Sequence, residues 1–198
     1  SNLLVSLGGQ PFIDVRLSFH SFLPADMDSV VSEKVVNAWL SHLSRYNELH
    51  DKVEFDVAIT ALTFDFKESV SNSLSGIISY EEQEVLRQAL FRLTNNLLLG
   101  KISSMSKQMK KIQLLRTRRN ELLRTYNKRE LNTVSNLLED CRYLGTIPFS
   151  VLARHAFIAN SFLRSLVRRN VLSESEALDF KKSIKISIFS QWEERSTF

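Results

Sequence analysis

A run of basic residues between positions 101 and 129 is the part of this sequence most able to bind a charged ligand. Ten cations fall within it and Glu121 is its one acid, whereas the whole chain carries a net charge of only +4. The cations are Lys101, Lys107, Lys110, Lys111, Arg116, Arg118, Arg119, Arg124, Lys128 and Arg129. The run therefore predicts a surface that attracts an anion or an acidic protein surface.

Arg116, Arg118 and Arg119 are the cations we single out as acceptor- or partner-binding residues. Arg116 and Arg119 fall where the apolar three-to-four spacing of the segment would otherwise continue. An arginine that leans inward needs a carboxylate or phosphate partner, or else its charge is costly. The alternative is that both side chains reach water along their apolar stems. Nucleic acid is the least favoured partner, because Tyr126 is the single aromatic residue of the run that could stack on a base.

The remaining chemically active residue types form no complete catalytic or metal site. His20, His42, His50 and His155 have no partner at metal-ligand spacing, so no metal site is predicted. His155 and its neighbour Arg154 lie in a largely apolar segment. They could bind an acceptor or transfer a proton, or His155 could simply be a packed histidine.

Other motifs that would carry a cofactor or a nucleophile are absent from the sequence. It contains no GxxxxGK[ST], GxGxxG, HExxH, CxxC or GxSxG pattern. Cys141 lies on an apolar helical stripe, which favours packing over reactivity. His50-Asp51 is typical of a turn or cap rather than of a catalytic dyad. We therefore expect no cofactor in this chain, and no turnover of ATP or phosphoenolpyruvate by this chain alone.

Two segments with alternating apolar and polar residues predict strands. Residues 11–20 read PFIDVRLSFH and residues 53–66 read VEFDVAITALTFDF. Alternation with β-branched and aromatic residues indicates half-buried strands, which would pair antiparallel.

The rest of the chain has the periodicity and capping residues of helices. Asp28 or Asp26 would cap a first helix, and pairs of Ser and Glu three residues apart (Ser79 with Glu82, Ser173 with Glu176) form capping boxes. Thr146 and Pro148 favour a further helix start. The predicted helices span 27–43, 79–100, 102–126, 131–141, 148–169 and a final segment from 173 through Trp192. The helix over 148–169 is apolar around most of its circumference and is predicted to be the central core helix.

Composition favours one intracellular, mostly helical domain. The chain has 198 residues, 43% of them hydrophobic, with only five glycines and three prolines. This predicts an α+β, predominantly α-helical fold: a helical bundle with a small antiparallel β hairpin or sheet, in a single domain over 1–198. A single cysteine and no long apolar run favour a cytoplasmic protein without a membrane span.

Four segments resemble phosphoenolpyruvate (PEP) synthase and pyruvate phosphate dikinase-like PEP/pyruvate-binding proteins. They are PFIDVRLSFHSFLPA at 11–25, NELHDKVEFDV at 47–57, LTN at 93–95 and GTIPFSVLARHAFIANSFLRSLV at 145–167. The resemblance runs in order along nearly the whole chain. His20 departs from it, standing where the related sequences carry Asn.

The resemblance implies a fragment of a larger multidomain phosphotransferase. It suggests the middle helical region, related to that of rifampin phosphotransferase, which would bind the acceptor or organise the flanking domains without being catalytic itself. ATP and Mg²⁺ are implied for the parent protein and not for this fragment. The expected partners are other domains of the same polypeptide or an anionic small-molecule acceptor. The alternative is a noncatalytic helical interaction module whose basic helix docks an acidic partner.

Overall fold

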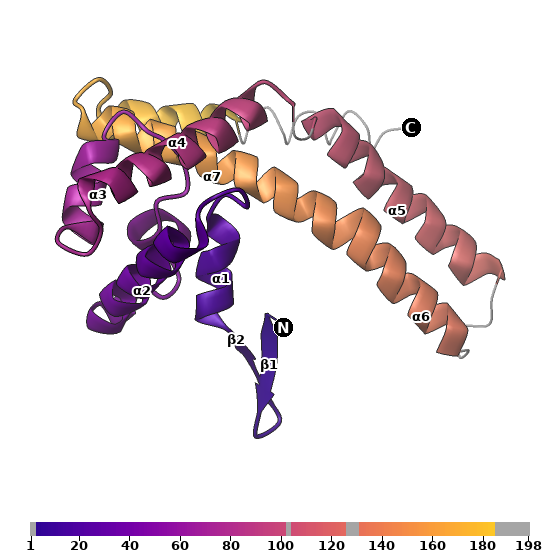
Figure 1. The fold of residues 1–198 in the computed structure, drawn as a ribbon. Helices are drawn as coiled ribbons and strands as arrows, with labels where there is room; N and C mark the ends of the chain where they lie inside the picture. The colour runs from indigo at the N-terminus through magenta and orange to yellow at the C-terminus, as the bar shows by residue number, and fades with distance from the viewer. Residues whose placement is uncertain (1–2, 102–103, 126–130, 185–198) are drawn as a thin grey trace.

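The computed structural model describes residues 3–101, 104–125 and 131–184, and it is mostly helical with one small sheet. Figure 1 shows two parts: a compact cluster built around helices α1 to α4, and a long arm in which α5 runs beside α6 and the first half of α7. The predicted class, predominantly helical α+β with a small antiparallel hairpin, is confirmed.

The hairpin lies at the N-terminal end rather than where the alternation predicted it. β1 (Leu4–Leu7) pairs antiparallel with β2 (Gln10–Ile13), with Leu4 opposite Ile13. Gly8 and Gly9 form the turn with φ of 58° and 79°, the left-handed values that a tight hairpin turn requires. The predicted pairing of residues 11–20 with 53–66 is therefore wrong.

Both mispredicted segments are mainly helical turns and loop. Asp14 accepts a hydrogen bond from the Leu17 amide at 3.0 Å and caps α1 (Val15–Phe22), so the extended chain stops at Ile13. Residues 53–57 form a π-helical turn, η2 (Val53–Val57), after a short 3-10 turn, η1 (Asn47–Leu49). The loop that follows leads into α3 (Phe66–Leu74). With no neighbouring strand to satisfy its amides, neither segment could remain extended and buried.

The predicted caps place the next helices correctly. Asp28 accepts from the amides of Val30 and Val31 and opens α2 (Ser29–Arg45). Ser79 and Glu82 form both bonds of a capping box at the start of α4 (Tyr80–Leu98). Gly100, with φ of 66°, lies just beyond its end, and the Lys101 amide bonds back to the Asn96 carbonyl at 2.9 Å.

The main core lies among α1, α2, α3 and α4. Its fully buried members come from all four helices and surround Trp39, whose ring meets Phe19 edge-on at 5.6 Å. The largest are Phe19, Val35, Val36, Trp39, Val70, Leu74, Leu86 and Leu90. Val57 and Ala58 add the η2 segment to this core.

The arm is built from α5 (Met105–Thr125) and a rod that runs from residue 131 to residue 168. The rod comprises α6 (Leu131–Asp140), a π-helical turn η3 (Cys141–Thr146) and α7 (Ile147–Arg168). The predicted start of an α-helix here is confirmed, because α7 begins at Ile147 with Pro148 in its first turn. The predicted cap is wrong, because Thr146 makes no side-chain cap hydrogen bond and its own backbone is helical. A wider turn just before Pro148 accommodates a residue that lacks an amide donor.

Helix α7 is not the central core helix that its composition predicted. Only Pro148, Ile158 and Ser165 are buried along it, and Phe149 is 67% exposed. A smaller cluster of Ala61, Leu97 and Ile158 joins α7 to the compact part. The first part of α7 lies in the narrow arm, beside α5.

The final helix begins where it was predicted to begin. Ser173 and Glu176 form the second capping box, and residues 174–184 are helical. The predicted continuation to Trp192 lies outside the described residues, as do Tyr126, Lys128 and Arg129 of the basic run. Among the helices that are described, none combines the length and apolar character that crossing a bilayer requires.

Candidate functional site

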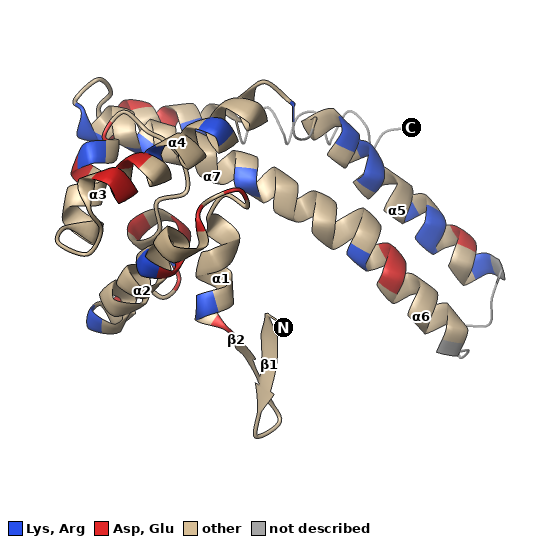
Figure 2. Cartoon of the chain, in the orientation of Figure 1, with Lys and Arg blue, Asp and Glu red and all other residues tan. Residues whose placement is uncertain are grey.

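The basic run forms an exposed, largely unpaired surface on α5. Figure 2 shows its cations along the outer length of the arm, with little acidic colour near them. We call five exposed residues the α5 basic surface: Lys107, Lys110, Arg116, Arg119 and Arg124. Within the described part of the chain, none of the five has an ion-pair or hydrogen-bond partner.

Arg118 differs from its neighbours because it is engaged inside the arm. Its Nε donates to a carboxylate oxygen of Asp140 at 2.9 Å, and the Asp140 side chain is only 12% exposed. This pair links α5 to the end of α6. Arg118 is therefore a structural residue of the arm, while Arg116 and Arg119 are the two predicted residues that remain free for a partner.

Repulsion among the cations of α5 is not offset within the helix. Lys107 and Lys110 are three residues apart, as are Arg116 and Arg119, so each pair lies on one side of the helix. Like charges at this spacing destabilise a helix by a few tenths of a kcal/mol per pair, an effect that salt weakens. The inward lean predicted for Arg116 and Arg119 does not occur, because both side chains are exposed.

Arg154 and His155 are engaged by the protein's own backbone. The Arg154 guanidinium donates to the carbonyls of Phe22 at 2.9 Å and Ser21 at 2.6 Å, at the end of α1. Burial lowers the pKa of Arg154. His155 Nδ1 lies 2.8 Å from the Val151 carbonyl one turn earlier in α7. The structure thus does not bring these two residues and the three arginines of α5 into one site.

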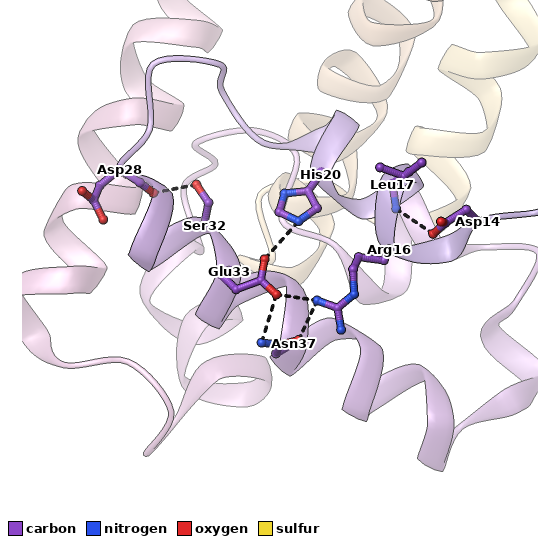
Figure 3. Close-up of polar contacts among 8 residues, drawn as sticks. All are labelled: Asp14, Arg16, Leu17, His20, Asp28, Ser32, Glu33 and Asn37. Atoms are coloured by element: carbon purple, nitrogen blue, oxygen red, sulfur yellow. Dashed lines mark hydrogen bonds and ion pairs between the residues drawn. The ribbon is translucent and has the colours of Figure 1, made fainter. Parts of the chain in front are cut away.

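A polar cluster around Glu33 joins α1 to α2 (Figure 3). Glu33 accepts from Arg16 at 2.6 Å and lies 3.3 Å from His20 Nε2, and Arg16 also donates to Asn37 at 2.8 Å. A His–Glu pair could exchange protons, but here the carboxylate is half exposed and already shared with Arg16. The cluster therefore fits a surface contact between helices better than an acid–base site.

Sequence analysis overlooked a row of arginines at the end of α7. Arg164 pairs with Asp56 of η2, Arg168 with Asp65 before α3, and Arg169 with Glu68 of α3 at 2.8 Å. Arg164 and Arg168 are one helical turn apart near the end of a helix rich in apolar residues, a spacing that could have singled them out.

Asp65, the partner of Arg168, is the most buried of the three carboxylates that pair with these arginines. Its side chain is only 4% exposed. Burial alone would raise its pKa. The neighbouring Ser165 side chain, together with hydrogen bonds from Arg168 and Thr63, outweighs that effect and holds the pKa below its ordinary value of 3.8.

The other sequence-level candidates have ordinary surroundings. Cys141, predicted to be packed, is exposed, because the stripe it continues faces outward at η3. His50 Nδ1 lies 3.1 Å from the Asn47 carbonyl within a local turn, as the turn interpretation predicted. Among the described residues, no three His, Cys, Asp or Glu side chains gather as metal ligands would.

Comparison with known proteins adds no relative: no protein-family model, no curated protein and no solved structure matches this chain.

Proposed function

We propose that this chain is a noncatalytic, domain-organising module whose α5 basic surface docks an acidic surface on a neighbouring domain of the same polypeptide. The parent would be a cytoplasmic, ATP-dependent phosphotransferase resembling PEP synthase. The observation that carries the proposal is the set of five exposed cations along a projecting arm, which have no partner among the described residues.

Charge complementarity determines the kind of partner. Opposite charges steer association and set the register of an interface, and their effect is strongest where several act together. The cations extend along the arm, so an extended acidic surface matches them better than one small acceptor does. Helix α5 has no aromatic residue between 105 and 125 on which a nucleobase could stack, which keeps nucleic acid the weakest candidate.

Acceptor binding through Arg154 and His155 receives less support. Both side chains already bond backbone carbonyls, so an acceptor would have to displace those contacts. The second candidate is the same surface docking a separate acidic protein. The same cations favour this second candidate. It differs from the first only in that the acidic partner is a separate polypeptide.

ATP and Mg²⁺ belong to the parent protein in this proposal. The resemblance implies them for the parent, and among the described residues no three acidic or imidazole side chains gather as Mg²⁺ ligands would. Any phosphotransfer would be catalysed by the flanking domains, with this module acting on their relative placement.

The test is charge reversal at Arg116 and Arg119, both changed to Glu, in the full-length polypeptide and in the isolated chain. We expect phosphotransfer to fall in the full-length protein, because a docked domain would meet like charge. The thermal midpoint of the isolated chain should stay unchanged or rise, since the substitutions relieve repulsion within α5.

The matched control reverses Lys52 and Lys67, which are exposed on the compact part and make no ion pair with any described residue. It changes the net charge by the same amount and should leave phosphotransfer intact. Full activity in the Arg116 and Arg119 variant would contradict docking within the polypeptide. If that variant keeps phosphotransfer but no longer binds a separate acidic protein that the parent binds, the second candidate holds.

A further inference from the structure

A small polar cavity of about 200 Å³ lies in the compact part of the molecule, between the segment 55–63, α3 and the second half of α7. Figure 1 shows these elements at the end of the molecule opposite the free tip of the arm. Its polar lining side chains are His42, Asp56, Thr60, Thr63, Ser69, Asn72, Ser73, Ser161, Arg164 and Arg168. Ten of its fifteen lining residues are thus polar, whereas a site for an apolar ligand would be lined mostly by apolar residues.

Two arginines supply the positive charge of this cavity, and each is only partly engaged. A guanidinium has five N–H donors in a planar fork. Arg164 donates to Asp56 through Nη2, and Arg168 donates to Asp65 through Nε. The Arg164 guanidinium also lies 5.9 Å from the centre of the Phe55 ring, and this contact helps to fix the orientation of the guanidinium plane. Donors of both side chains therefore remain for an acceptor inside the cavity.

A buried hydroxyl among the lining residues has no hydrogen-bond partner in the described part of the chain. Thr60 is only 2% exposed, lines the cavity, and its Oγ1 makes no hydrogen bond. Leaving a buried hydroxyl unpaired costs free energy, so such groups are rare and call for an explanation. An acceptor oxygen in the cavity would satisfy the Thr60 hydroxyl and the spare guanidinium donors together.

We propose that this cavity binds a small oxyanion, either a phosphate or a short carboxylate, through Arg164, Arg168 and the Thr60 hydroxyl. Guanidinium forks match the paired oxygens of both groups, and the hydroxyl adds a neutral donor. Asp56 is the one carboxylate of the lining, and its negative charge is paired with Arg164. This site is separate from the α5 basic surface and does not rest on the docking proposal.

The experiment is isothermal titration of the purified chain with sodium phosphate and, in a second arm, sodium acetate, both at constant ionic strength set with sodium chloride. We expect saturable binding with one site per chain in at least one arm, and the tighter arm identifies the oxyanion class. Thr60→Val keeps the side-chain shape and removes the hydroxyl. It should weaken binding about tenfold while the ligand-free thermal midpoint stays the same or rises.

Arg164→Lys keeps the charge and removes the fork, and it should also weaken binding about tenfold. The matched control is Arg169→Lys, because Arg169 pairs with Glu68 and does not line the cavity. The control should bind the anion with the affinity of the parent. The variant with Arg116 and Arg119 both changed to Glu should do the same, and this result would show that the cavity and α5 are separate sites. Absence of saturable binding in both arms would overturn the proposal. Parent-like affinity in both Thr60→Val and Arg164→Lys would overturn it equally, by showing that the anion binds elsewhere.

Discussion

Arg154 lies on α7, where its guanidinium reaches the carboxyl end of α1. The last carbonyls of a helix have no partner within the helix, so a side chain that donates to them acts as a cap from outside. Arg154 meets two of these carbonyls, on Ser21 and Phe22, and so ties the rod to the compact part. The residue that sequence reasoning marked for an acceptor is thereby used for assembly of the fold.

We predict that Arg154→Met lowers the free energy of unfolding by about 2 kcal/mol, because it leaves two carbonyls without their charged donor. Urea denaturation followed by circular dichroism measures this change. Arg119→Met serves as the control and should change the free energy by less than about 0.5 kcal/mol, because Arg119 is exposed on α5 and contacts no described partner. If Arg154→Met has the same free energy of unfolding as the parent, Arg154 is again a candidate for acceptor binding.

Asp65 makes stability depend on pH in a defined direction. Its folded pKa lies below 3.8, so the unfolded chain takes up a proton at a higher pH than the folded chain does. The stabilisation is therefore complete above the unfolded pKa and is lost as the pH falls through the folded pKa. The relevant window lies below pH 3.8.

We predict that Asp65→Asn lowers the free energy of unfolding by about 1–3 kcal/mol at pH 7, because Arg168 loses its charged acceptor. The difference from the parent should stay constant between pH 7 and pH 5 and narrow below pH 3.8. Urea titrations at pH 7, 5 and 3 measure it. Glu68→Gln, which breaks the half-exposed pair with Arg169, should have little effect at any of these values. A pH-independent difference would show that Asp65 acts through packing alone.

At the scale of the elements, α7 has two different environments along its length. From Arg154 onward it contacts the compact part, through Arg154, Ile158 and the arginine row, whereas its beginning contacts α5. Gly145, just before it, allows close packing, since a Cβ there would come within 3.0 Å of Leu115 on α5. The apolar residues that point away from both neighbours stay exposed.

We predict a graded series for three Phe→Ala substitutions. Phe19→Ala should cost about 3–5 kcal/mol, because Phe19 is fully buried against Trp39. Phe157→Ala should cost about 2 kcal/mol, because this ring is half-buried and meets the rings of Phe22 and Phe55 in T-shaped contacts. Phe149→Ala should cost less than about 0.5 kcal/mol, since Phe149 is exposed. Chemical denaturation of the three variants measures the series. A larger loss of stability for Phe149→Ala than for Phe19→Ala would mean that α7 is the core helix after all.

At the scale of the whole molecule, the long arm gives the chain an extended shape (Figure 1). A continuous rod over 131–168 is roughly 55 Å long at the rise of an α-helix. The basic helix runs along this rod, so its cations lie away from most of the acids of the compact part (Figure 2). This separation leaves the α5 basic surface open to a partner.

We predict that small-angle X-ray scattering of the monomer gives a radius of gyration clearly above about 16 Å, the value for a compact domain of this length. The projecting arm is the reason, because it places mass far from the centre. Raising the salt concentration should leave the radius unchanged, since no ion pair among the described residues joins α5 to the compact part. A radius near 16 Å would mean that the arm folds back on the compact part.

Local chemistry in the sequence was sufficient to place most helices. Asp28, the Ser79–Glu82 pair and the Ser173–Glu176 pair each open a helix where predicted, because a cap bonds amides within three residues of itself. Gly100 ends α4 for an equally local reason, the left-handed backbone that only glycine adopts readily. The class of the fold followed from these signals together with the scarcity of glycine and proline.

The sequence by itself thus determined where α2, α4 and the final helix begin, where α4 ends, and that α5 is strongly basic. Tertiary structure decided what depends on distant partners: that residues 11–20 and 53–66 have no strand to pair with, that α7 is half exposed, and that Arg154 caps α1. It also brought Thr60 to the same cavity as Arg164 and Arg168, about a hundred residues away in the chain. Contacts between distant residues depend on how the whole chain packs, and no local spacing records them.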